Sequence, residues 1–189
     1  MNPPKYDPEM HHRRSIRLQG YDYSQAGAYY ITICTQKRAC LFGQIVDGEM
    51  VLNEYGEIVK TEWLKTSKIR RNITLDEFVI MPNHLHGIII ITEKNEMANI
   101  VGAIHRIAPT NEIQQPPRLQ SGSMGAIIGQ YKSIITKRIN QIRDTPGFSV
   151  WQRNYYEHII RNENELNRIR KYILNNPANW LNDKNRADY

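Results

Sequence analysis

The stretch that most constrains the fold of this chain covers residues 78–91 and reads FVIMPNHLHGIIII. An apolar run typical of a strand stops at Pro82 and Asn83, and a second run begins with His-Leu-His and continues into four isoleucines. Because β-branched residues favour strands, a run that is apolar at successive positions predicts a central strand covered on both faces. Pro82 excludes the primed turns of tight hairpins, so we expect a slightly longer or bulged connection between the two strands.

The two histidines of this stretch are a candidate metal site. Side chains alternate between the faces of a strand, so His84 and His86 are expected to point the same way. Two imidazoles placed in this manner can share one cation. They can equally be partly exposed strand-end histidines without a ligand, and the pair alone does not decide between these interpretations.

Composition predicts one domain with a substantial core. The chain has 189 residues, of which 40% are hydrophobic, and this length suits a single domain. No apolar run approaches the roughly 20 residues of a membrane helix, and no basic-then-apolar leader opens the sequence. Cys34 and Cys40 follow neither a zinc nor a redox spacing. We therefore expect a cytoplasmic protein with reduced thiols and no membrane partner.

The positive charge of the chain is concentrated in its second half. The net charge is +6, and residues 124–172 contain nine Lys or Arg against four acids, interleaved with tyrosines and a tryptophan. Basic and aromatic residues together favour single-stranded nucleic acid, although a solvated basic face over core aromatics would give the same composition. His158 could contact a phosphate, the metal or only the core. The candidate nucleic-acid contacts are Arg13, Arg14, Arg17, Lys132, Arg153, Tyr155, His158, Arg161 and Arg168.

Local patterns predict an α+β domain. We expect a basic arm over residues 1–20, one domain over 21–182 with an irregular, mobile loop at 93–123, and a tail over 183–189. Hydrophobic periodicity predicts helices over 54–68 and 124–143, and β-rich runs predict strands over 27–35, 41–46, 49–52, 75–81 and 84–92. Residues 148–160 are expected to be extended.

The last helix is expected to begin after Asn162, which caps it with Glu165 in the reciprocal position, and to end at Asn176 before Pro177. Its apolar stripe faces the core. A second column, spaced by four residues, consists of Arg168, Tyr172 and Asn176. A tyrosine hydroxyl and an amide oxygen would thus project together, unless Tyr172 is a rim residue and Asn176 only a helix-end residue.

Four segments in this order resemble one family. GAYYITICT, MPNHLHG, WQRNYYEHIIRNENEL and YILNNP together are similar to the REP-associated tyrosine transposases, a branch of the HUH single-strand nucleases. The resemblance implies a ferredoxin-like HUH fold, with a central antiparallel sheet, flanking helices and the histidine hairpin in the middle of the sheet.

The resemblance also implies roles for individual residues. His84 and His86 match the pair that binds a divalent cation, Mg²⁺ or Mn²⁺, and Asn176 falls at the position of a polar third ligand. Tyr172 matches the nucleophile, which forms a 5′-phosphotyrosine with single-stranded DNA at or beside a hairpin. The implied activity is metal-dependent endonuclease and strand-transfer activity, by a monomer or a homodimer.

Three alternatives remain open from the sequence. The protein could bind hairpin DNA without cutting it. It could hydrolyse phosphodiesters by water attack, with Tyr172 as a bystander. The nucleophile could also be Tyr131, although its spacing places it on an apolar helix face.

Overall fold

The computed structural model describes residues 22–92 and 122–186, so the predicted arm over 1–20 and nearly all of the predicted loop over 93–123 lie outside the described residues. The helices and strands in chain order are β1 (Gly27–Cys34), η1 (Gln36–Arg38), β2 (Gly43–Val46), β3 (Glu49–Leu52), α1 (Glu54–Lys68), β4 (Ile73–Met81), β5 (His84–Ile91), α3 (Met124–Ile142), β6 (Tyr156–Ile160), α4 (Glu163–Leu174) and η2 (Trp180–Asn182).

The main sheet is antiparallel, with strand order β4-β5-β1-β6, and β2 and β3 form a separate hairpin. The predicted α+β class is confirmed. The isoleucine-rich strand β5 is internal and almost wholly buried, as a strand covered on both faces should be. The histidine hairpin does not occupy the middle of the sheet, however, because its other strand, β4, is an edge strand.

The extended stretch predicted over 148–160 is a strand only from Tyr156 onward. Before β6, Trp151 makes an isolated bridge to Thr35. Between them, the carbonyl oxygens of Gln152 and Arg153 accept hydrogen bonds from Nζ of Lys132 on α3, at 2.6 and 3.1 Å. The backbone NH of Gln152 still donates to the carbonyl oxygen of Cys34 at 3.0 Å, so contact with β1 continues before the regular strand begins.

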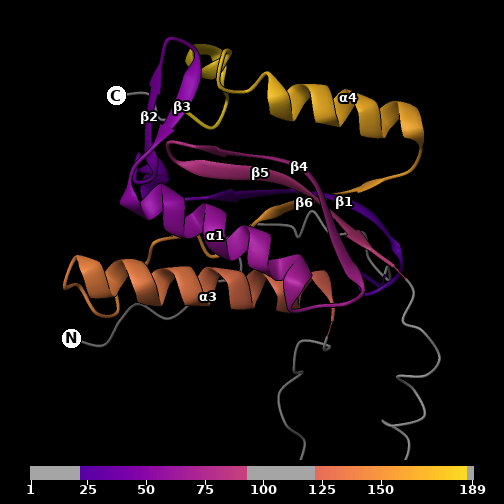
Figure 1. Ribbon diagram of the computed structural model, residues 1–189, viewed down its shortest axis with the longest axis horizontal. Coiled ribbons are helices and arrows are strands. Elements are labelled where there is room, and N and C mark those ends of the chain that lie inside the picture. The colour runs from indigo at the N-terminus through magenta and orange to yellow at the C-terminus, as the bar shows by residue number, and fades with distance from the viewer. Residues whose placement is uncertain (1–21, 93–121, 187–189) are drawn as a thin grey trace, which may run out of the picture.

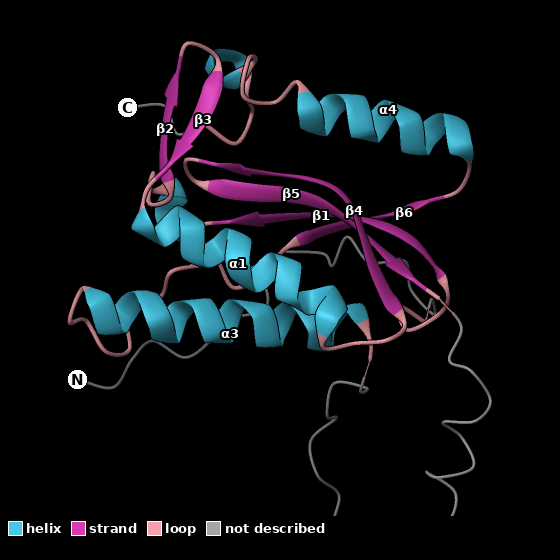
Figure 2. Ribbon diagram, in the orientation of Figure 1, coloured by secondary structure: helices cyan, strands magenta, loops and turns pink. Residues whose placement is uncertain are grey.

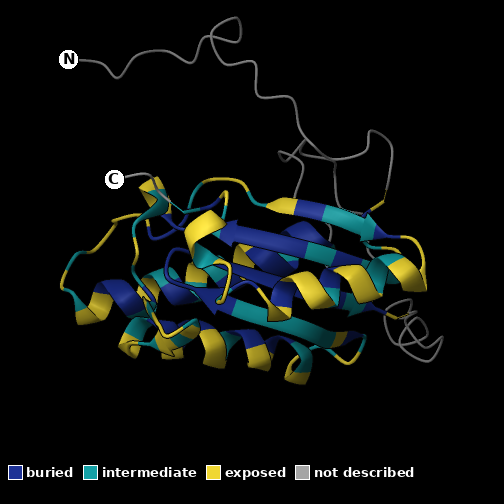
Figure 3. Cartoon of the chain, turned by 90° about the horizontal axis from the view of Figure 1, so that it is seen from above, coloured by how far each residue is buried: buried dark blue, intermediate teal, exposed yellow. Residues whose placement is uncertain are grey.

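The helices cover the two faces of the sheet unequally (Figure 1, Figure 2). α1 and α3 pack side by side on one face, and α4 lies alone on the other. Figure 3 shows the consequence: buried residues are concentrated on the strands, while the outer faces of the helices are exposed. Within the described ranges, none of the helices combines the length and the apolar character that crossing a membrane requires.

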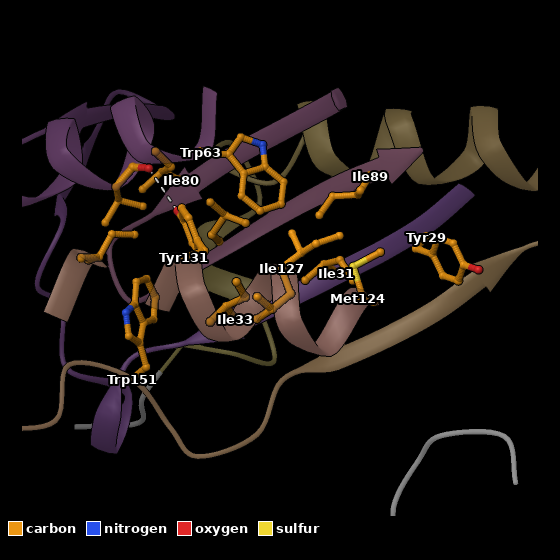
Figure 4. Packing of buried hydrophobic residues seen from close by; sticks show 14 of the residues in the cluster. Tyr29, Ile31, Ile33, Trp63, Ile80, Ile89, Met124, Ile127, Tyr131 and Trp151 are labelled. Atoms are coloured by element: carbon orange, nitrogen blue, oxygen red, sulfur yellow. Dashed lines mark hydrogen bonds between the residues drawn. The ribbon is translucent and has the colours of Figure 1, made fainter. Parts of the chain in front are cut away.

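The larger core lies between the sheet and the α1–α3 pair (Figure 4). Trp63 is fully buried, and its ring centroid lies 5.3 Å from that of Tyr131 in an edge-on contact. Tyr131 donates its hydroxyl to the carbonyl oxygen of Val59 at 3.0 Å. On β5, Gly87 allows Trp63 to lie against the strand, because a Cβ at this position would come within 2.4 Å of Cζ2 of Trp63.

The smaller core lies under α4. It consists of four buried isoleucines, namely Ile88, Ile160, Ile169 and Ile173. A bidentate ion pair reinforces it, since Nε and Nη2 of Arg170 lie 2.8 and 2.6 Å from the two carboxylate oxygens of Asp76 on β4. These contacts fix the helix that carries Tyr172 against the sheet.

Candidate functional site

The site begins at the turn between β4 and β5. Pro82 and Asn83 alone form the connection, and Met81 pairs directly with His84. The expectation of a longer or bulged connection is therefore wrong. Neither turn residue has a positive φ, so a two-residue loop forms here without the primed geometry. The register shift of this hairpin lies instead within β4, between Leu75 and Phe78.

Asn83 orients His84. Its Nδ2 donates to the carbonyl oxygens of Arg38 and Asn185 at 3.1 and 2.8 Å. Its Oδ1 lies 2.7 Å from Nδ1 of His84 and can only accept, so Nδ1 of His84 carries the proton. The lone pair of a neutral His84 is consequently on Nε2, which is fully buried and has no hydrogen-bond partner among the described residues.

His86 lies on the same face of β5, as predicted, and its ring centroid is 4.5 Å from that of His84. Its Nδ1 contacts Oη of Tyr30 at 2.7 Å and Oγ1 of Thr32 at 2.8 Å. Both partners come from β1, where Thr32 is directly opposite His86 in the register. The neighbouring strand β1 thus holds the His86 ring so that its Nε2 is directed toward Tyr172, whose Oη lies 3.4 Å away.

The helix α4 delivers Tyr172 to this face. Asn162 caps the helix as predicted, accepting from the backbone NH of Glu165 at 2.9 Å. Glu165 itself accepts from the backbone NH of Arg161 rather than from that of the cap residue. The helix ends at Leu174, so Asn176 lies in the turn beyond it. Asn176 is 3% exposed and its Oδ1 has no partner among the described residues.

Asp183 completes the cluster and was not predicted from the sequence. Its side chain is 2% exposed, and its Oδ2 lies 3.5 Å from Nε2 of His84. His84, His86 and Asp183 each offer a ligand atom within 4.8 Å of the others. After η2, two backbone carbonyls hold the chain near the site: that of Asn185 accepts from Asn83 of the hairpin turn, and that of Lys184 accepts from Arg38 of η1. Asp183 lies in a segment without hydrophobic periodicity, so no sequence pattern indicated that it would contact the histidines.

Burial controls the protonation of the site. It lowers the pKa of His84 and, together with the neighbouring His84, that of His86. Asp183 and Asn176 oppose the effect on His84. Both imidazoles are consequently neutral near pH 7 and can act as ligands. Burial and the charge of Asp183 also raise the pKa of Tyr172, whose side chain is still partly exposed.

The donor set suits a divalent cation. Buried polar atoms normally have a partner, yet Nε2 of His84, Oδ1 of Asn176 and Oδ2 of Asp183 all lack one among the described residues. The set offers imidazole nitrogen, amide oxygen and carboxylate oxygen, all of which are common metal ligands. The His-His-Asp cluster is compatible with metal binding, and Asn176 is a further candidate ligand.

The predicted nucleic-acid contacts fall into separate groups. Lys132 and Arg153 contact each other on the side of α3. His158 and Arg168 both contact the carboxylate of Glu165 at the start of α4. Nε2 of His158 is 2.8 Å from Oε1 of Glu165. His158 thus pairs with a residue of the adjoining helix and lies outside the histidine and aspartate cluster. Arg161 adjoins the second group and Tyr155 lies beside β6, while Arg13, Arg14 and Arg17 lie outside the described residues.

Tyr131, the rival nucleophile, is 4% exposed in the larger core. Its hydroxyl is bound to Val59, and burial raises the pKa of that hydroxyl. Tyr172 is by contrast 40% exposed and contacts His86. Only Tyr172 of these two tyrosines reaches the histidine pair.

Comparisons with known proteins match most of the chain. No family model matches. An uncharacterized protein from Haemophilus influenzae is 42% identical over 180 residues, which cover 95% of this chain and 96% of that protein. Among solved structures, a REP-associated tyrosine transposase bound to a REP hairpin matches with a TM-score of 0.53, at 16% identity, over 88% of this chain and 74% of the transposase. The chain therefore belongs to the same family as the Haemophilus influenzae protein, and its fold is similar to that of the REP-associated tyrosine transposase.

Proposed function

We propose that this protein is a metal-dependent endonuclease and strand transferase that acts on single-stranded DNA at or beside a hairpin. The observation that carries the proposal is the position of Tyr172, whose Oη lies 3.4 Å from Nε2 of His86 and beside a buried cluster with unpaired ligand atoms. A nucleophile and a metal site next to each other are what phosphodiester transfer requires.

The metal would be held by His84, His86 and Asp183, with Asn176 as a further ligand, and Mg²⁺ or Mn²⁺ is the expected ion. When bound, it supplies positive charge that counters the negative charge of the phosphodiester. The protein prepares the ligands beforehand: Asn83 fixes the tautomer of His84, and burial keeps both imidazoles neutral.

Tyr172 would make the new bond. Its phenolic oxygen attacks phosphorus, the 3′-oxygen of the preceding nucleotide leaves, and a 5′-phosphotyrosine and a free 3′-hydroxyl result. The phenolic proton passes to solvent, because the side chain is 40% exposed and His86, the imidazole that contacts its hydroxyl, is assigned to the metal in this proposal. The linkage retains the energy of the phosphodiester, so a second 3′-hydroxyl can displace the tyrosine and rejoin the strands.

The substrate class rests on two observations. The REP-associated transposase with a similar fold is bound to a REP hairpin. This chain also carries a net charge of +6, which favours contacts with phosphates. Hairpin DNA with a single-stranded flank is therefore the substrate with which to begin.

The test uses Mn²⁺ and hairpin DNA labelled at either end. A 5′-phosphotyrosine retains the DNA on the 3′ side of the cut, so 3′-labelled DNA should migrate with the protein on a denaturing gel. The 5′-labelled fragment should be released. Tyr172→Phe should abolish the adduct, whereas Tyr131→Phe should retain it.

Each other outcome identifies an alternative. Binding without an adduct across a panel of hairpins would support the non-catalytic hairpin-binding protein. Cleavage without an adduct that persists in Tyr172→Phe would support water attack. An adduct that survives Tyr172→Phe but not Tyr131→Phe would transfer the nucleophilic role to Tyr131.

A further inference from the structure

A cavity of about 240 Å³ lies beside the histidine pair, between β1, β6 and the segment after η2. Its walls include Tyr30 and Thr32, the two residues that contact Nδ1 of His86. The cavity is thus adjacent to the proposed catalytic centre. None of its lining residues is a candidate metal ligand or the nucleophile.

Strand register explains the aromatic wall of this cavity. Thr32 of β1 is opposite His86 on one side and Tyr156 of β6 on the other. Directly opposed residues of antiparallel strands share a face, so Tyr156 lies on the same face as the site. The Tyr30 ring is 6.1 Å from that of Tyr156 and 6.4 Å from that of Tyr172, edge-on to both. Tyr156 is 44% exposed, which leaves its ring available to a ligand.

The polar wall of the cavity contains an unpaired donor. Asn185 is 8% exposed, and its Nδ2 has no hydrogen-bond partner among the described residues. The rest of this residue is held in place, because its carbonyl oxygen accepts from Asn83 and its Oδ1 lies 3.9 Å from Sγ of Cys34. A fixed, buried amide NH₂ without an acceptor indicates a ligand that brings one.

We infer that this cavity binds the base of a nucleotide next to the scissile phosphate. The inference rests on the proposed function and adds a protein contact that selects the cleavage position. The ring of Tyr156 would stack on the base, and Nδ2 of Asn185 would donate to a carbonyl or ring nitrogen of the base. A buried donor discriminates well, because a base without a matching acceptor leaves it unpaired.

The test measures binding in the Tyr172→Phe background with Mn²⁺, so that no adduct forms. The probes are hairpin oligonucleotides with a fluorescent label, each with one abasic nucleotide at a different position of the single-stranded flank. One abasic position should weaken binding roughly tenfold, the size expected for the loss of one stacked base.

Further substitutions locate the lost contact. Tyr156→Leu and Asn185→Ala should each bind intact DNA more weakly, and the penalty at that abasic position should shrink or vanish. Tyr156→Phe retains the ring and should keep the penalty. Phe148→Leu is a matched control, because Phe148 is an aromatic residue, 67% exposed, that does not line this cavity.

The result can separate this inference from the proposed function. If the unsubstituted protein forms its adduct while Tyr156→Leu and Asn185→Ala both keep the full abasic penalty, the base binds elsewhere and this inference alone fails. If the unsubstituted protein neither forms an adduct nor binds any hairpin DNA, the proposed function fails and this inference with it. Circular dichroism of each variant shows that loss of binding does not reflect unfolding.

Discussion

The two faces of the same four-stranded sheet are built for different tasks. The face under α1 and α3 is almost entirely apolar and carries most of the buried side chains of the described residues. The face under α4 has four buried isoleucines at one end and the polar cluster of His84, His86 and Asp183 at the other. Strand β5 contributes side chains to both faces of the sheet, because its alternate residues point to opposite faces.

This difference indicates how a site with unpaired buried atoms can be tolerated. Leaving a buried polar atom without a partner costs about 1–3 kcal/mol, and three such atoms belong to the candidate ligands His84, Asn176 and Asp183. The apolar face can offset this cost because its burial does not depend on the site. Substitutions on the apolar face should therefore change global stability, and those in the polar cluster should mainly change ligand binding.

The largest expected effect is on the apolar face. Trp63→Ala should lower the free energy of unfolding by about 3–5 kcal/mol, since it removes a fully buried ring. Leu64→Ala on the same helix is a control, because Leu64 is 41% exposed and should change stability by no more than about 0.5 kcal/mol. Urea unfolding followed by circular dichroism measures both. Equal losses would contradict the division between the two faces.

The second effect concerns the polar cluster. Mn²⁺ at about a hundredfold excess over its dissociation constant should raise the free energy of unfolding by about 2.7 kcal/mol. The double variant His84→Ala/His86→Ala should show no such rise, while His158→Gln should retain it because His158 is paired with Glu165 outside the cluster. Thermal unfolding with and without Mn²⁺ reports the result independently of catalysis. A shift that persists in the double variant would place the metal elsewhere.

The smallest effect tests how α4 is held. The Arg170 guanidinium holds the pKa of Asp76 below its ordinary value, so the pair stabilises the protein above about pH 4 and loses this contribution as the pH falls through the lowered pKa. Arg170→Gln should cost about 1 kcal/mol at pH 7, because the pair is partly exposed. The difference from the unsubstituted protein should shrink as the pH falls below about 4.

Lys171→Gln provides the matched control for this measurement, since Lys171 is exposed on the same helix. Urea unfolding at pH 7 and at about pH 3 compares the three proteins. A difference that is the same at both pH values would show that Arg170 acts through packing alone.

Much of the fold could be predicted because local patterns and tertiary structure agree. The periodicity of α1 and α3, the β-rich runs of β2 and β3 and the cap at Asn162 are local signals, and the elements that they predict are present. β6 is shorter than predicted, and the carbonyls of Gln152 and Arg153 before it bind Lys132 of α3, a contact that no local pattern specifies. The edge position of β4 depends on which strands pair with β1, and no local pattern specifies that choice.

The candidate site shows the same division. The alternation of a strand was enough to place His84 and His86 together. Helical spacing predicted one column for Tyr172 and Asn176, but α4 ends at Leu174 and Asn176 lies in the turn beyond it. Only the family resemblance predicted that the two histidines would lie beside Tyr172 and Asn176. Asp183 could not be predicted, because its position depends on hydrogen bonds between residues about one hundred positions apart, such as Asn83 and Asn185.

Gly87 belongs to the apolar face although it adjoins the histidines in sequence. Its missing side chain lets the Trp63 indole press on the backbone of β5 immediately after His86. A strand with a flat aromatic ring against its back has little freedom to bend, so the separation between the two imidazoles is set from behind by the core. The positions of the two candidate ligands thus depend on a tryptophan of α1 that packs on the opposite face of the sheet.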